Sequence, residues 1–319
     1  MYVQESGRAG RDRETSYCGI VFSENDQRLN NEILRGEISF EEMSKLYDER
    51  KYSQSDDIDR LLFFHFNNFR GRDEEYKQIR ELISELFNGD INPNKDFIKT
   101  INFSKQKEKE KSLYRLLRIG VIKDYEVNYG RKFFRVYVNK VNLNSYKDHL
   151  LAFIKLTEPG RYNQMKESLS NIEESNSRKM IYEMAKKLIF FIYENIEKAR
   201  RNSIREITEL ARNANKDNEI RKRILAYLEE GFGSEEISNI IDDTDIFLSS
   251  WIDLIDKIET PLDSQQLRGH AIRQMESSAR HPGLLLIRAI TELYNIDGDS
   301  KIASNSFKEA FLNSSDYSI

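Results

Sequence analysis

The stretch QESGRAGRD, residues Gln4–Asp12, concentrates residue types that can bind phosphate groups. Arg8 and Arg11 each follow a glycine, Gly7 and Gly10. Guanidinium groups stay charged and can form two parallel hydrogen bonds with phosphate oxygens. The glycines permit the tight backbone turns that would aim both arginines at one anion. The stretch therefore looks like part of a phosphate-binding site.

A short strand and a group of helices are expected to position this stretch. Residues 15–22, TSYCGIVF, form an apolar run and predict a buried strand. Apolar residues then recur at helical spacing and predict helices near 26–35, 39–49, 57–68 and 72–88. Gly89 is expected to close the last of these helices. His65 has no metal-ligating partner at helical spacing, which favours a structural role.

Residues 92–142 predict a winged helix with a β-hairpin as its wing. A first helix is indicated by the apolar residues Phe97, Ile98 and Ile101. It is followed by a predicted second helix at about 107–119 and two alternating strands at 121–129 and 131–138. Gly130 joins the strands and is expected to supply the positive φ of a tight turn.

Residues 143–319 predict an all-helical C-terminal region, because no strand pattern returns. One apolar stripe runs through 176–213, and further helices are expected at about 216–230, 233–241, 244–257, 263–279, 283–294 and 304–312. Charged residues make up 33% of the chain, with only 14 Gly and 4 Pro, a balance that suits long solvated helices. The predicted fold class is mainly α, with a small α/β remnant at the N-terminus.

The stretch QESGRAGRD resembles motif VI of superfamily 2 helicases, Q-x-x-G-R-x-G-R, and in particular its RecQ branch. The resemblance implies that Arg8 and Arg11 are catalytic, with Arg11 as the arginine finger that reaches the γ-phosphate of ATP. The residues implied to couple ATP to closure of the lobes are Gln4, Gly7, Gly10 and Asp12. Arg13 replaces the usual glycine after G-R-D, which alters the local turn but leaves both arginines in place.

The RecQ-like resemblance also implies a domain order. Residues 1–25 would end the second RecA-like lobe, and 26–91 would form a helical subdomain that often carries zinc in this family. Residues 92–142 would be a winged helix that grips duplex DNA, and SLYRLLRIGVIKDYEVNY (112–129) is similar to segments of bacterial RecQ-type proteins. The implied activity is that of an ATP-dependent 3′–5′ DNA helicase.

Some motifs of such a helicase do not occur in the sequence. There is no G-x-x-x-x-G-K-[ST] loop and no D-E-x-H or D-E-x-D box, so ATP and Mg²⁺ would be bound mainly by a first lobe that this chain lacks. We therefore expect Met1 to be an internal start or a truncation, and no ATP hydrolysis by this chain alone. Cys18 is the single cysteine, so neither zinc nor a disulfide framework is expected.

The candidate DNA-binding residues lie in a locally basic segment. Residues 104–140 contain eleven basic and four acidic residues, within a chain of net charge −4. Six side chains are the candidates: Lys111, Arg115 and Arg118 on one face of the second helix, and Tyr129, Arg131 and Lys132 at the hairpin tip. Tyr129 would either stack on a terminal base pair as a separation pin or cap the hairpin against Phe133. An ordinary solvated surface is the alternative for the charged residues.

Two further functions remain open from the sequence. The chain could be a winged-helix DNA-binding regulator in which the N-terminal match is coincidental, or a helical module that recruits protein partners through residues 143–319. No apolar run approaches the roughly 20 residues that a membrane helix needs, and no signal peptide is recognisable. A cytoplasmic location and no membrane partner are therefore expected.

Overall fold

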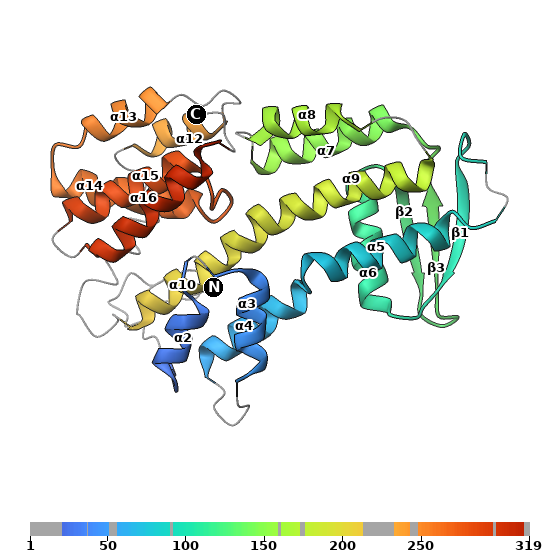
Figure 1. Cartoon of the computed structure of the whole chain (residues 1–319), viewed down its shortest axis with the longest axis horizontal. Coiled ribbons are helices and arrows are strands. Elements are labelled where there is room, and N and C mark those ends of the chain that lie inside the picture. Colours follow the sequence, from blue (N-terminus) through green and yellow to red (C-terminus); the bar gives the residue numbers. More distant parts are fainter. Residues whose placement is uncertain are drawn as a thin grey trace, which may run out of the picture.

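The protein consists mainly of helices with one small antiparallel sheet (Figure 1). The computed structural model describes residues 21–36, 38–50, 56–89, 92–158, 161–172, 176–212, 233–242, 248–295 and 298–315. The motif VI residues, nearly all of the strand expected at 15–22 and the helix expected at 216–230 lie outside these ranges. Among the described residues, no helix is both long enough and apolar enough to span a bilayer.

The four helices expected in the N-terminal region are confirmed: α2 (Gln27–Ile33), α3 (Phe40–Asp48), α4 (Asp57–Asn68) and α5 (Arg72–Leu86). Three of them begin at a side chain that accepts a backbone N–H bond, namely Asp26, Ser39 and Asp56. Their apolar faces share one core with the sheet and the long central helix, and Ile33, Met43 and Ile79 are fully buried in it. Local capping and apolar spacing thus account for these helices.

The segment around Phe97 is a strand, and the helix predicted there is wrong. Strand β1 (Phe97–Asn102) pairs antiparallel with β3 (Phe133–Val138), which also pairs with β2 (Ile122–Asn128). Helix α6 (Gln106–Arg118) lies between β1 and the hairpin, as expected for the second helix. The spacing of Phe97, Ile98 and Ile101 fits a helix or a strand, and pairing with β3 decides for the strand. Consequently the element directly before α6 is a strand, and α5, which packs on α6, is separated from it by β1 rather than by the short turn of a helix-turn-helix.

The hairpin turn differs from the expected one at the residue with positive φ. Residues Tyr129–Lys132 connect β2 to β3, and Lys132 has a φ of 54°. Gly130 is absent from the positive-φ residues of the described chain, so its expected role is wrong. Longer hairpin loops commonly consist of a type I turn, and here the left-handed residue comes at the end of the loop. Asn128 Oδ1 supports the loop by accepting a bond of 2.8 Å from the Arg131 N–H.

A long central helix connects the parts of the molecule (Figure 1). It comprises α9 (Ser177–Phe191), a π-helical turn η3 (Ile192–Glu197) and α10 (Lys198–Arg212). Helices α7 (Leu143–Thr157) and α8 (Tyr162–Ser170) precede it, and α7 packs on both α6 and α9. Polar side chains of the π-helical turn contact different neighbouring segments. Tyr193 contacts α5, and Asn195 accepts a bond of 2.9 Å from Arg161.

Helices are the only regular elements among the described residues of 143–319, as predicted. The part of it that follows the central helix, from residue 233 on, is called the C-terminal region from here on. Its helices are α12 (Ser234–Asp242), α13 (Leu248–Asp256), α14 (Pro261–Gln274), α15 (Pro282–Tyr294) and α16 (Ser300–Ser314). They form a second apolar cluster around the fully buried Trp251. Gly283 lies against the Trp251 ring, where any Cβ would overlap its atoms. Arg288 joins this region to the central helix through an ion pair with Glu206.

Candidate nucleic-acid interface and a charged cavity

Two of the predicted phosphate contacts on α6 are paired inside the protein. Lys111 forms an ion pair with Glu75 of α5, and its Nζ donates to the backbone oxygen of Asn68 at 2.6 Å. Arg115 reaches the same Glu75 carboxylate at 3.4 Å. The side chains of Lys111 and Arg115 are only 22% and 13% exposed. The expectation that this helix face is free for phosphates is therefore wrong at these two residues.

Glu75 is the centre of this internal network. It is 3% exposed and also accepts a hydrogen bond of 2.7 Å from the Tyr193 hydroxyl. That hydroxyl in turn accepts from the N–H groups of Arg70 and Gly71, at 3.1 and 2.9 Å. Burial, followed by the adjacent Glu75 charge, raises the pKa of Tyr193 and keeps it a neutral donor. The basic face of α6 is thus used to fix α6 against α5 and the π-turn.

Arg118, one turn further along α6, lies at the surface. Its Nε donates to the Tyr114 hydroxyl at 2.8 Å, and its guanidinium lies 4.8 Å from the centroid of that ring. Tyr114 is itself an exposed aromatic residue on α6. The pair presents a cation beside an aromatic face, a combination that can contact both the backbone and the bases of a nucleic acid.

The hairpin tip carries the remaining predicted contacts, and all of them are exposed. Tyr129 is 67% exposed, and its ring packs edge-on against Phe103 at 5.8 Å, so the predicted contact with Phe133 is replaced by one with Phe103. Arg131 and Lys132 are exposed beside it, and neither side chain has an ion-pair partner among the described residues. An aromatic ring and two cations available to solvent are therefore gathered at this tip.

His65 has the structural environment expected for it. Its Nε2 lies 2.9 Å from Glu197 Oε1 of the π-turn, and both side chains are almost completely buried. Glu197 also pairs with Arg201 at 2.7 Å. Within the described part of the chain, no three His, Cys, Asp or Glu side chains come together as a possible metal site.

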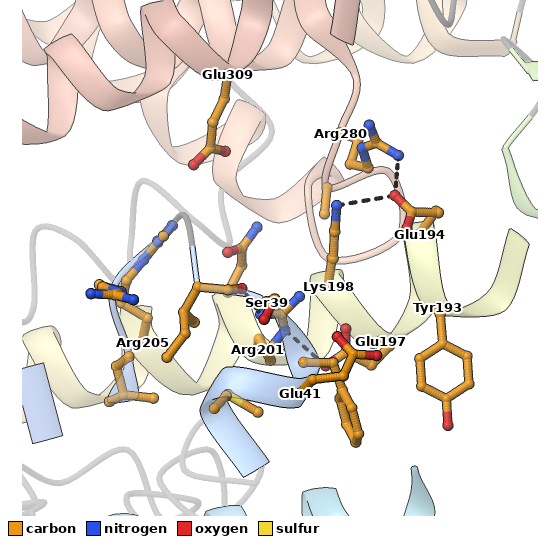
Figure 2. Close-up of a pocket in the computed structure, with 18 of the residues that line it drawn as sticks. Ser39, Glu41, Tyr193, Glu194, Glu197, Lys198, Arg201, Arg205, Arg280 and Glu309 are labelled. Atoms are coloured by element: carbon orange, nitrogen blue, oxygen red, sulfur yellow. Dashed lines mark hydrogen bonds and ion pairs between the residues drawn. The ribbon is translucent and has the colours of Figure 1, made fainter. Parts of the chain in front are cut away.

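A cavity of about 460 Å³ lies where α3, the central helix and the C-terminal region meet (Figure 2). No motif in the sequence pointed to this cavity. Its charged lining residues are Arg35, Glu41, Arg72, Glu194, Glu197, Lys198, Arg201, Arg205, Arg280, Lys308 and Glu309. The one local signal was a cluster of basic residues at 198–205, within the stretch 176–213 that carries the apolar stripe. The other lining groups come from segments far apart in the sequence.

The electrostatics of the cavity centre on Glu194 (Figure 2). Arg72 and Lys198 lie 3.2 and 3.0 Å from its carboxylate oxygens, and Arg280 also pairs with it. Burial alone would raise the pKa of Glu194, but Lys198 and Arg280 outweigh it and hold that pKa below its usual value. Burial and the neighbouring Arg280 charge lower the pKa of Lys198. One carboxylate therefore faces three cations.

Comparisons with known proteins found no relative: no family model, no curated protein and no solved structure matches the chain.

Proposed function

We propose that this chain contributes motif VI and a duplex-binding surface to a RecQ-like 3′–5′ DNA helicase. The observation that carries the proposal is the hairpin tip, where Tyr129, Arg131 and Lys132 are exposed together. Cations at such a tip can contact phosphates without sequence preference, as a translocating enzyme requires. The exposed ring can stack on a terminal base pair during strand separation.

The motif VI resemblance supplies the motor part of the proposal. Arg8 and Arg11 would stabilise charge on the γ-phosphate, whereas the ligands for Mg²⁺ and the triphosphate would come from a first RecA-like lobe outside this sequence. ATP hydrolysis would thereby be coupled to unwinding of DNA held at the hairpin. Arg118 and Tyr114 extend the proposed contact surface along α6.

The test is the salt dependence of DNA binding by single variants of the hairpin. Each phosphate that a cation neutralises contributes about −0.9 to the slope of log K against log salt on duplex DNA. Arg131→Ala and Lys132→Ala should each flatten this slope by about one unit. Tyr129→Ala should leave the slope unchanged, because stacking releases no counterion. Fluorescence anisotropy with duplex and forked DNA at several salt concentrations measures these slopes.

Two controls make this test specific to the hairpin. Lys301→Ala removes an exposed cation from α16, and Lys111→Met removes one that is paired with the buried Glu75 inside the protein, so neither should change the slope. Equal changes in the hairpin variants and in Lys301→Ala, or no change in any of them, would refute the hairpin as the DNA contact.

A partner-recruiting role for the C-terminal region is the second candidate. It is favoured by large apolar side chains that the last described helix leaves exposed, namely Phe307, Phe311 and Leu312. Unchanged DNA binding in every hairpin variant would favour this candidate over the first.

A further inference from the structure

The described residues that line the cavity carry more positive than negative charge. Seven of them are basic and four are acidic, and Arg72, Lys198 and Arg280 all pair with Glu194 at one corner. The same corner is partly enclosed, with Arg280 17% exposed. Like charges held close together in a partly dehydrated space repel one another, and an incoming anion would relieve that repulsion.

The types of the three cations suit a phosphorylated ligand. The Arg72 guanidinium can donate two parallel hydrogen bonds to phosphate oxygens, and the Lys198 ammonium acts as a compact charge beside it. Arg280 donates from Nε and Nη2 to Asn313 Oδ1, at 2.9 and 2.6 Å, so it would contribute its charge through Nη1, the nitrogen that contacts Glu194. Arg72 and Lys198 are about one-third exposed, at 35% and 36%, so a ligand can reach them. A doubly charged phosphate group would offset part of the excess positive charge.

The size and the walls of the cavity indicate that the ligand is more than a phosphate ion. A volume of about 460 Å³ lies within the range of about 300–1,000 Å³ that is typical of small-molecule sites. Apolar side chains line part of the wall, among them Leu34, Phe40 and Leu312. They can contact an uncharged moiety while the phosphate groups lie at Glu194. Arg201 and Arg205 line the part of the cavity wall that α10 forms (Figure 2).

We propose that this cavity binds a small phosphorylated molecule of nucleotide size, held at its phosphate groups by Arg72, Lys198 and Arg280. Glu194 organises the three cations when the ligand is absent and competes with it for them. Because α3, the central helix and the segment at Arg280 all contribute lining residues, the ligand would join the C-terminal region to the rest of the molecule.

The experiment is calorimetric titration of the purified chain with pyrophosphate, in EDTA and about 150 mM salt, where exposed charges are largely screened. Lys198→Gln should weaken pyrophosphate binding about tenfold or more, because a charge-assisted contact is lost. Glu194→Gln should tighten it, because the competing carboxylate is removed. Opposite effects from the two partners of one ion pair would not arise if the pair were only structural.

Lys186→Gln is the matched control. Lys186 lies on the same long helix, pairs with Glu183 at 3.4 Å and is 38% exposed, close to the 36% of Lys198, but it does not line the cavity. It should leave pyrophosphate affinity unchanged. Circular dichroism checks that each variant is folded.

Titrations with ATP and adenosine identify the source of the phosphate. Tighter binding of ATP than of pyrophosphate indicates a nucleotide, and equal affinity indicates recognition of the phosphate groups alone. Repeating the titration with Arg11→Ala separates this site from the motif VI arginines, because binding should persist. The proposal fails if pyrophosphate does not bind, if Lys186→Gln weakens binding as much as Lys198→Gln, if Glu194→Gln also weakens it, or if a DNA oligonucleotide displaces pyrophosphate.

Discussion

Basic residues on α6 and at the hairpin tip have the same side-chain chemistry but different surroundings. Lys111 and Arg115 are enclosed and share the buried carboxylate of Glu75. Arg131 and Lys132 are exposed and have no ion-pair partner among the described residues. Enclosed cations are retained by the fold because losing their partner would leave an unpaired buried charge, whereas exposed ones are available to an external anion. Stability and binding should therefore respond separately to substitutions in the two groups.

The largest effect is expected from removing the shared carboxylate of the enclosed group. Glu75→Gln would leave Lys111 and Arg115 partly buried without a counter-charge and would weaken the contact with Tyr193. The free energy of unfolding should fall by about 3 kcal/mol, as for other broken buried pairs. Urea denaturation monitored by circular dichroism measures this change.

Glu74→Gln is the control for that prediction, because Glu74 is the neighbouring residue on α5 and is exposed. Its effect should stay within about 0.5 kcal/mol. If the two variants were equally stable, the enclosed group would not be structural, and Lys111 and Arg115 would again be candidates for DNA contact.

A smaller effect, dependent on pH, is expected from His281, an enclosed basic residue packed on Trp251. Burial lowers the pKa of His281 from 6.5 to about 3. Between these values the unfolded chain binds a proton that the folded chain does not. Stability is therefore fully present above pH 6.5 and falls as the pH decreases, by at most about 1.4 kcal/mol per pH unit.

The variant His281→Asn isolates this contribution. Asparagine is also a favourable N-cap residue, so its side-chain oxygen can accept the bond that the Gly283 N–H donates to His281 Nδ1. The difference in unfolding free energy between the wild type and this variant should change between pH 6.5 and 5. A difference that stays constant over this range would show that His281 titrates alike in the folded and the unfolded chain, which contradicts the prediction.

The smallest effects are expected at the exposed hairpin tip, where the backbone rather than the side chain is constrained. Lys132→Val should cost about 1 kcal/mol, since a β-branched residue is disfavoured at its φ of 54°. Gly130→Ala should change stability by less than about 0.5 kcal/mol, because no positive φ is required there. A larger cost for Gly130→Ala would restore the turn predicted from the sequence. Thermal unfolding of the two variants decides between these outcomes.

The sequence predicted those features that depend on neighbouring residues. Apolar spacing located α2 to α5, α6 and most of the C-terminal helices, and alternation located β2 and β3. The structural role of His65 also followed from its local pattern. These signals are readable because helix faces and strand faces repeat every few residues. The exposed residues Tyr129, Arg131 and Lys132 at the hairpin tip were predictable for the same reason.

Other features were decided by contacts between distant segments. The six residues of β1 form a strand because β3 supplies their hydrogen-bond partners, although their spacing also fits a helix. Lys111 and Arg115 have the helical spacing of a phosphate-binding face, yet both are paired with Glu75 on another helix. The cavity exists only because Arg72, Glu194 and Arg280 meet in the folded chain. Charge and side-chain type are properties of the sequence, whereas burial and pairing are properties of tertiary structure, because only packing brings distant groups together and removes them from water.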